Sequence, residues 1–107
     1  MTKIETMDLT QAEWVATQKE TANAHILDVR TPQEFEAGHI PGAQNLDIQQ
    51  PNLFMDGLAK LAADQHYFVY CRSGARSAQA CQILAQSGLQ NVYNLVGGIL
   101  EWEGPTE

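Results

Sequence analysis

The fold is decided by one stretch, Tyr67-Phe68-Val69-Tyr70-Cys71-Arg72-Ser73-Gly74-Ala75-Arg76-Ser77. Its first four residues are apolar or aromatic, which favours a buried β-strand. A polar segment follows that contains a cysteine, a glycine, two arginines and two serines, and a helical pattern begins beyond it at Ala78. In a strand, a tight loop and a helix joined in this order, free backbone N–H groups and the helix dipole converge on one point. The sequence therefore predicts an anion-binding loop with a thiol at its entrance.

Cys71 is the candidate catalytic residue, because such a loop favours the thiolate over the thiol. The predicted anion-binding residues are those that follow it, Arg72, Ser73, Gly74, Ala75, Arg76 and Ser77. Gly74 permits the curled backbone that turns several N–H groups inward. The guanidinium of Arg76 can bind two oxygens of one tetrahedral anion. The alternative is that Cys71 is merely a small buried residue at the end of a strand.

Helical and strand patterns alternate along the rest of the chain. Two capping boxes, Thr10 to Glu13 and Thr31 to Glu34, predict helix starts, the second with Pro32 at the first helical position. We expect helices over residues 11–19, 32–37, 53–63, 78–87 and 99–102, and strands over 24–29, 44–48, 67–70 and 91–96. This alternation predicts an α/β fold with a mostly parallel central sheet and helices on both faces. A length of 107 residues suits a single domain over residues 1–107.

The charge balance limits the classes of partner. Thirteen acidic residues against six basic ones leave a formal net charge of −7, which argues against nucleic acid or an anionic membrane as the main partner. No apolar run approaches the length of about 20 residues that spans a membrane. The segment Met1 to Thr10 has no export signal pattern, and two cysteines do not make a disulfide framework. We therefore expect a cytoplasmic location.

Other chemistry-bearing residues have two interpretations each. Asp28 and Arg30 follow a predicted strand beside the loop, where they could support the loop by hydrogen bonds or form an internal ion pair that fixes the turn. Cys81 could resolve an oxidised Cys71, but its place on the apolar face of a helix favours packing in the core. The three histidines have no metal-ligand spacing, and Gly97-Gly98 lacks the other residues of a nucleotide-binding loop. We expect no metal and no cofactor.

Three segments resemble the rhodanese family of sulfurtransferases, and the resemblance extends over nearly the whole chain. The first is Leu27 to Phe35 together with Gly38 to Ala43, the second is Cys71 to Ser77, and the third is Leu95 to Trp102. The resemblance implies a rhodanese-like three-layer sandwich. It also implies that Cys71 takes sulfane sulfur from a donor such as thiosulfate, carries it as a persulfide, and passes it to cyanide or a thiol.

The length of the loop separates the related classes. Four residues lie between Cys71 and Arg76. The phosphatases and arsenate reductases that share this general fold have five, and Ser77 stands where their arginine would be. The resemblance thus favours sulfur transfer over phosphate chemistry. A different class remains open, a sulfur-relay or sensing module with a polysulfide or protein donor and little turnover of small molecules. The partners implied are a small sulfur donor, a thiol acceptor, and a thioredoxin-like protein or a cysteine desulfurase.

Overall fold

The structure is a computed structural model that describes residues 6–107. Residues 1–5, which belong to the predicted domain 1–107 and to the segment inspected for an export signal, lie outside the described part. A five-stranded sheet forms the centre of the molecule, with strands in the order β1-β5-β4-β2-β3 and every neighbouring pair parallel. The strands are β1 (Thr6–Leu9), β2 (Ala24–Asp28), β3 (Ala43–Asn45), β4 (His66–Tyr70) and β5 (Asn91–Leu95). The predicted α/β class with a parallel sheet is confirmed.

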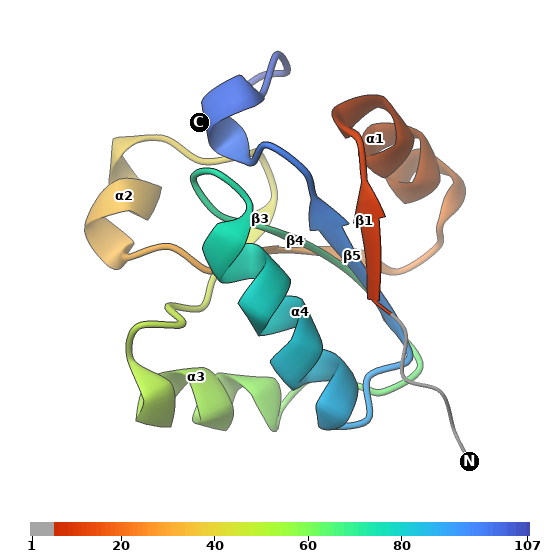
Figure 1. The fold of residues 1–107 in the computed structure, drawn as a ribbon, viewed down its shortest axis with the longest axis vertical. Coiled ribbons are helices and arrows are strands. Elements are labelled where there is room, and N and C mark those ends of the chain that lie inside the picture. The colour runs from red at the N-terminus through yellow and green to blue at the C-terminus, as the bar shows by residue number, and fades with distance from the viewer. Residues whose placement is uncertain (1–5) are drawn as a thin grey trace.

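Helices pack on both faces of this sheet (Figure 1). They are α1 (Gln11–Glu20), α2 (Pro32–Ala37), α3 (Pro51–Leu58), α4 (Ala75–Gln86) and a terminal 3-10 turn η1 (Ile99–Glu101). Residues of α3 and α4 share one buried cluster with the sheet, and residues of α1 share another with the C-terminal segment. The result is the three-layer sandwich expected from the resemblance.

Strand β4 shows how the sequence produces two cores. Tyr67 and Val69 belong to the cluster under α3 and α4, whereas Phe68 and Tyr70 belong to the cluster under α1. Successive side chains of a strand point to opposite faces, so four large residues in a row are buried only in a sheet that is covered on both sides. Trp14 of α1 packs edge-on against Phe68 and Tyr70. Strand β4, which leads to Cys71, is therefore packed on both of its faces.

Local capping explains where several helices begin. Thr10 and Thr31 each accept a hydrogen bond from the backbone N–H of a glutamate three residues later, and each glutamate side chain accepts one in return. Both capping boxes predicted from the sequence are thus confirmed. Among residues 6–107, none of the helices has the length and apolar character needed to span a membrane.

Several predicted boundaries were wrong, and one strand was missed. β1 pairs with β5 at the edge of the sheet, although only Leu9 of its four residues is buried. The helix predicted over residues 53–63 runs from Pro51 to Leu58, and the one predicted from Ala78 begins at Ala75. The strand predicted over 44–48 is limited to Ala43–Asn45. Both helices begin before the positions predicted, because Pro51 in α3 and residues assigned to the loop in α4 occupy the first helical turn.

Candidate active site

The chemistry-bearing residues gather at one edge of the sheet. Cys71 follows β4, Arg30 follows β2 and Gly97 follows β5, and all three strands run in the same direction. The carboxyl ends of parallel strands therefore meet at this edge, which is where open α/β sheets bind ligands. Helix α4 begins at the same edge, at Ala75, with Gly74 as its N-cap residue. The loop and the helix dipole thus converge on the end of β4.

Cys71 is the first residue of this loop and is nearly buried, with 1% of the residue exposed. The backbone N–H of Gly74 donates to its sulfur at 3.0 Å, and the hydroxyl oxygen of Ser77 lies 3.4 Å away. Burial raises the pKa of Cys71, but hydrogen bonds from the Ser77 hydroxyl and from the amides of Ser77, Gly74 and Ser73 outweigh it, so the net pKa is below the ordinary value. These donors therefore make Cys71 easier to ionise than a thiol that is buried without them.

The turn after β5 holds the loop in this shape. The N–H of Ile99 donates to the carbonyl of Cys71 at 3.0 Å, and the N–H of Leu100 donates to the carbonyl of Arg72 at 2.9 Å. Gly98 approaches so closely that a Cβ on it would lie 2.5 Å from the Cys71 carbonyl oxygen. Its φ of 58° and ψ of −161° are also available essentially to glycine alone. The carbonyls of Cys71 and Arg72 thus accept hydrogen bonds from this turn, while the amides of Ser73, Gly74 and Ser77 face the sulfur.

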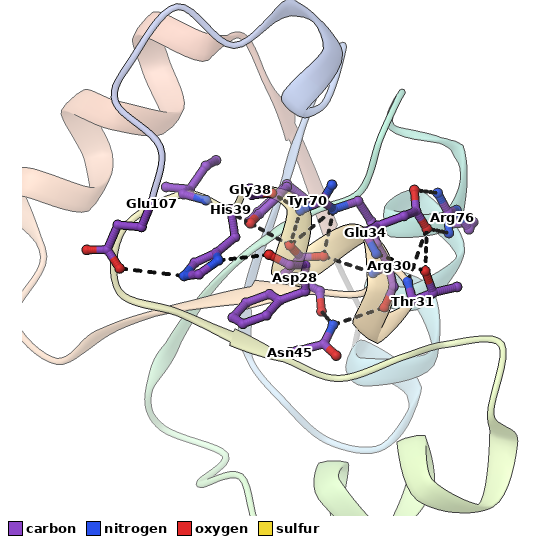
Figure 2. Close-up of polar contacts among 12 residues, drawn as sticks. Asp28, Arg30, Thr31, Glu34, Gly38, His39, Asn45, Tyr70, Arg76 and Glu107 are labelled. Atoms are coloured by element: carbon purple, nitrogen blue, oxygen red, sulfur yellow. Dashed lines mark hydrogen bonds and ion pairs between the residues drawn. The ribbon is translucent and has the colours of Figure 1, made fainter.

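Arg76 forms a two-pronged ion pair with Glu34 of α2 (Figure 2). Its two terminal nitrogens donate to the two carboxylate oxygens at 2.9 and 3.0 Å. Hydrogen bonding from Arg76 lowers the pKa of Glu34 to about 2, with the Thr31 cap contributing in the same direction. The pair joins the first turn of α4 to α2. It also places the Arg76 charge where it interacts with Cys71.

Asp28 and Arg30 form a buried ion pair beside the loop, with the closest contact at 2.6 Å (Figure 2). Arg30 also donates to the Gly38 carbonyl, at 2.7 Å. The hydroxyl of Tyr70 donates to Asp28 at 2.6 Å and accepts from the N–H of Ile40 at 3.0 Å. Burial and the bond to Asp28 raise the pKa of Tyr70. This geometry matches the interpretation of an internal ion pair that fixes the turn after β2.

The structure brings the predicted site residues together unequally. The amides of Ser73, Gly74 and Ser77 hydrogen-bond toward the sulfur. Arg72 is exposed, and together with Arg30 it helps to line a pocket of about 420 Å³ between α2 and η1. Ala75 opens α4. Sequence reasoning missed Glu34 as a partner of Arg76 and Asn94 as a partner of Ser77, because each contact joins residues far apart in the chain.

A family model described as Rhodanese-like domain matches residues 11–105. The chain belongs to the rhodanese-like domain family. It is 41% identical over 83 residues to a protein named Sulfurtransferase from Allochromatium vinosum, an alignment that covers 78% of this chain and 75% of that protein. It is 38% identical over 81 residues to the uncharacterized protein YqhL of Bacillus subtilis, which covers 76% of this chain and 62% of the relative. The resemblance to this family is therefore confirmed.

Other rhodanese-like proteins agree with this assignment. The putative sulfur carrier protein YrkF of Bacillus subtilis is 32% identical over 83 residues, 78% of this chain but 43% of YrkF. A rhodanese-related protein from Thermoplasma volcanium superimposes with a TM-score of 0.79 at 31% identity, covering 94% of this chain and 97% of that one. A rhodanese-like domain protein from Staphylococcus aureus superimposes with a TM-score of 0.80 at 29% sequence identity, covering 94% of this chain and 96% of that one. These relatives thus include one named a sulfurtransferase and one named a putative sulfur carrier.

The second cysteine of this rhodanese-like chain is in the core. Cys81 lies on α4, has 1% exposure and belongs to the cluster under α3 and α4. Burial raises the pKa of its thiol. The interpretation of Cys81 as a packing residue therefore agrees with its place. Within residues 6–107, no three His, Cys, Asp or Glu side chains gather in an arrangement that could hold a metal ion.

Replacing Gly98 tests how the last turn holds the rhodanese-like loop. We expect Gly98→Ala to lower the free energy of unfolding by about 3 kcal/mol or more, because backbone strain adds to a clash with the Cys71 carbonyl. Urea denaturation measures the change. Gly42→Ala is the matched control, since Gly42 also has a positive φ, 85°, but nothing lies near its would-be Cβ. It should cost about 1–2 kcal/mol, and equal losses in the two variants would contradict the account.

Replacing Glu34 tests the ion pair through its pH dependence. The folded pKa of Glu34, about 2, is below its ordinary value of 4.5, so the ionised carboxylate stabilises the fold above pH 4.5 and this stabilisation is lost as the pH falls through about 2. Glu34→Gln keeps a cap acceptor but loses the charge. We expect it to destabilise the fold by about 1 kcal/mol at neutral pH, since the pair is partly exposed.

The difference in unfolding free energy between the wild type and Glu34→Gln should shrink as urea denaturation is repeated from pH 4.5 down to pH 2. Glu36→Gln, at an exposed position of the same helix, is the control and should change stability little at any pH. A loss in Glu34→Gln that stays constant over this pH range would show that the charge of Glu34 does not stabilise the fold.

Proposed function

We propose that the chain is a sulfurtransferase that carries sulfane sulfur as a persulfide on Cys71. The observation that carries this proposal is the Gly74 N–H, 3.0 Å from the Cys71 sulfur, inside a loop with four residues between Cys71 and Arg76. Backbone donors at a helix N-terminus stabilise the thiolate, which is the form that attacks an incoming sulfur atom when the loop admits the donor. Membership of the rhodanese-like family supports the same chemistry.

The proposed reaction has two displacements at sulfur. In the first, the Cys71 thiolate attacks the outer sulfur of thiosulfate, a bond forms between the two sulfurs, and the bond within thiosulfate breaks so that sulfite leaves with the electron pair. In the second, cyanide or a thiolate attacks the outer sulfur of the persulfide, and the Cys71 thiolate leaves. Each step begins or ends with negative charge on sulfur. Fixed N–H donors stabilise that charge without reorganising.

The arginines have different proposed roles. Arg72 is exposed at the rim of the loop, and with Arg30 it lines the pocket of about 420 Å³, so it can attract an anionic donor. Arg76 is held by Glu34, so its charge is fixed near the sulfur rather than free to follow a ligand. Asp28 and Arg30 support the site from outside the loop by fixing the turn after β2. We propose that residues 1–107 act as one domain in this reaction.

A sulfur-relay module is the second candidate, and one observation favours it. The relative YrkF is named a putative sulfur carrier protein. In that case a polysulfide or a protein persulfide, such as that of a cysteine desulfurase, is the donor. A thioredoxin-like protein would supply the accepting thiol. The loop chemistry is the same in both candidates.

Mass spectrometry of the intact protein after incubation with thiosulfate tests the proposed persulfide. We expect the wild type to gain the mass of one sulfur atom and to lose it on addition of a thiol, because a thiolate displaces the Cys71 sulfur. Cys71→Ser should gain nothing. Cys81→Ser is the matched control and should gain sulfur as the wild type does, since Cys81 lies in the core.

The same experiment with polysulfide separates the two candidates. Rapid loading by thiosulfate together with continuous production of sulfite in the presence of cyanide indicates a thiosulfate sulfurtransferase. Loading by polysulfide with little sulfite production from thiosulfate indicates a relay. A sulfur gain that persists in Cys71→Ser, or no gain from either donor, would contradict the proposed function.

A further inference from the structure

The Ser77 hydroxyl has one proton and three acceptors. Its oxygen lies 3.4 Å from the Cys71 sulfur, 3.1 Å from the Gly74 carbonyl and 2.5 Å from Oδ1 of Asn94. Ser77 is fully buried, so no solvent is available to share these contacts. A serine hydroxyl donates only one hydrogen bond at a time. The position of that proton therefore decides whether Ser77 stabilises the Cys71 thiolate.

The orientation of the Asn94 amide is set by its other neighbours. Its nitrogen donates to a carboxylate oxygen of Asp8 on β1 at 3.0 Å and reaches the Gly74 carbonyl at 3.5 Å. Both of these groups only accept hydrogen bonds, so the nitrogen must face them and Oδ1 must face Ser77. Two oxygens at 2.5 Å require a proton between them, and only Ser77 can supply it. In this arrangement the hydroxyl proton points to Asn94.

This arrangement suits a protonated Cys71 better than an ionised one. With its proton on the Asn94 side, Ser77 turns a lone pair toward the sulfur, which can accept from an S–H group but repels a thiolate. Donation to a thiolate requires the hydroxyl to rotate. Rotation leaves Oδ1 of Asn94 without its donor at a position that is only 4% exposed, which has a cost. The two acceptors therefore oppose each other.

We propose that Asn94 competes with the Cys71 sulfur for the Ser77 proton, so that the hydroxyl turns to the sulfur only while that sulfur is anionic. When a persulfide forms, the charge moves to the outer sulfur and the hydroxyl returns to Asn94. No proton leaves Ser77 in this exchange; the hydroxyl only rotates about its Cβ–Oγ bond. Asn94 is thus a positioning residue that acts through Ser77. Its part in the persulfide step rests on the proposed function, whereas its effect on the free thiol does not.

Replacing Asn94 leaves the other charged and titratable groups near Cys71 in place. Arg76 and Cys81 of α4 interact electrostatically with Cys71, and Asp8 of β1 interacts with Cys81. Glu34 of α2 and Asp47, which follows β3, act on Arg76. Arg72 follows Cys71 in the loop. A substitution of Asn94 by an uncharged residue alters none of these charges.

The test is a titration of the Cys71 thiol, followed by the ultraviolet absorbance of its thiolate, in the wild type and in Asn94→Leu. Leucine has a similar size but no acceptor, so Ser77 is free to donate to the thiolate. We expect the pKa of Cys71 to fall by about one unit in Asn94→Leu, because a hydrogen bond to a charged acceptor is stronger than one to a neutral acceptor. In a Ser77→Ala background the same substitution should produce no fall.

Two further variants keep the proposal falsifiable. Asn91→Leu, at the other end of β5, is the control and should leave the Cys71 pKa unchanged. If Asn94→Leu does not fold, Asp8→Ala takes its place, since Asp8 is exposed and its removal allows the Asn94 amide to turn over. Asp8→Ala should also lower the pKa of Cys71. Because it removes a negative charge as well, only the part of the fall that disappears in a Ser77→Ala background tests the proposal.

An unchanged or higher pKa in Asn94→Leu, or a fall that persists without the Ser77 hydroxyl, would overturn the proposal. The same holds for Asp8→Ala if no part of its effect depends on Ser77. The titration needs no sulfur donor, so its result is independent of whether Cys71 forms a persulfide. A protein that fails to load sulfur but shows the Ser77-dependent shift would contradict the proposed function and still support the competition for the proton.

Discussion

Two backbone hydrogen bonds hold the active-site loop in shape, from the N–H of Ile99 to the Cys71 carbonyl and from the N–H of Leu100 to the Arg72 carbonyl. A tight loop has as many carbonyls as amides, and the carbonyls must find donors elsewhere if the amides are to face an anion. The turn after β5 provides these donors, and Gly98 permits the approach because a Cβ would strike the Cys71 carbonyl. The turn after β5 therefore shapes the loop through its backbone. Within residues 6–107, no side chain of this turn hydrogen-bonds to the Cys71 sulfur.

On the α2 side of the loop, Glu34 both stabilises the fold and positions a charge near Cys71. Glu34 closes the capping box of α2 and also binds Arg76 with both carboxylate oxygens. One side chain thus fixes a helix start and the position of a cation near Cys71. The chain as a whole carries a net charge of −7, so positive potential near Cys71 depends on local groups. Positive potential at the site comes from the helix terminus and from arginines held in place.

The sequence predicted features that depend on neighbours in the chain. Capping boxes at Thr10 and Thr31 and the alternation of strands and helices are local patterns, and they led to the parallel sheet and to Cys71 at its carboxyl edge. β1 was missed because its pairing with β5, rather than its own apolar pattern, makes it a strand. The contacts of Glu34 with Arg76 and of Ser77 with Asn94 join distant segments, and many polar residues could have been the partner.

The Ser77 hydroxyl and the loop amides together overcome the effect of burial on the pKa of Cys71. Cys81 is an internal control, because it is equally buried ten residues later and burial raises the pKa of its thiol above 9.0. Carbon-13 NMR of the two labelled cysteine β-carbons, followed as the pH is raised, measures both in one sample. We expect Cys71 to titrate below 9.0, whereas Cys81 stays protonated beyond that pH. Titration of Cys71 at or above 9.0, or of both thiols together, would contradict it.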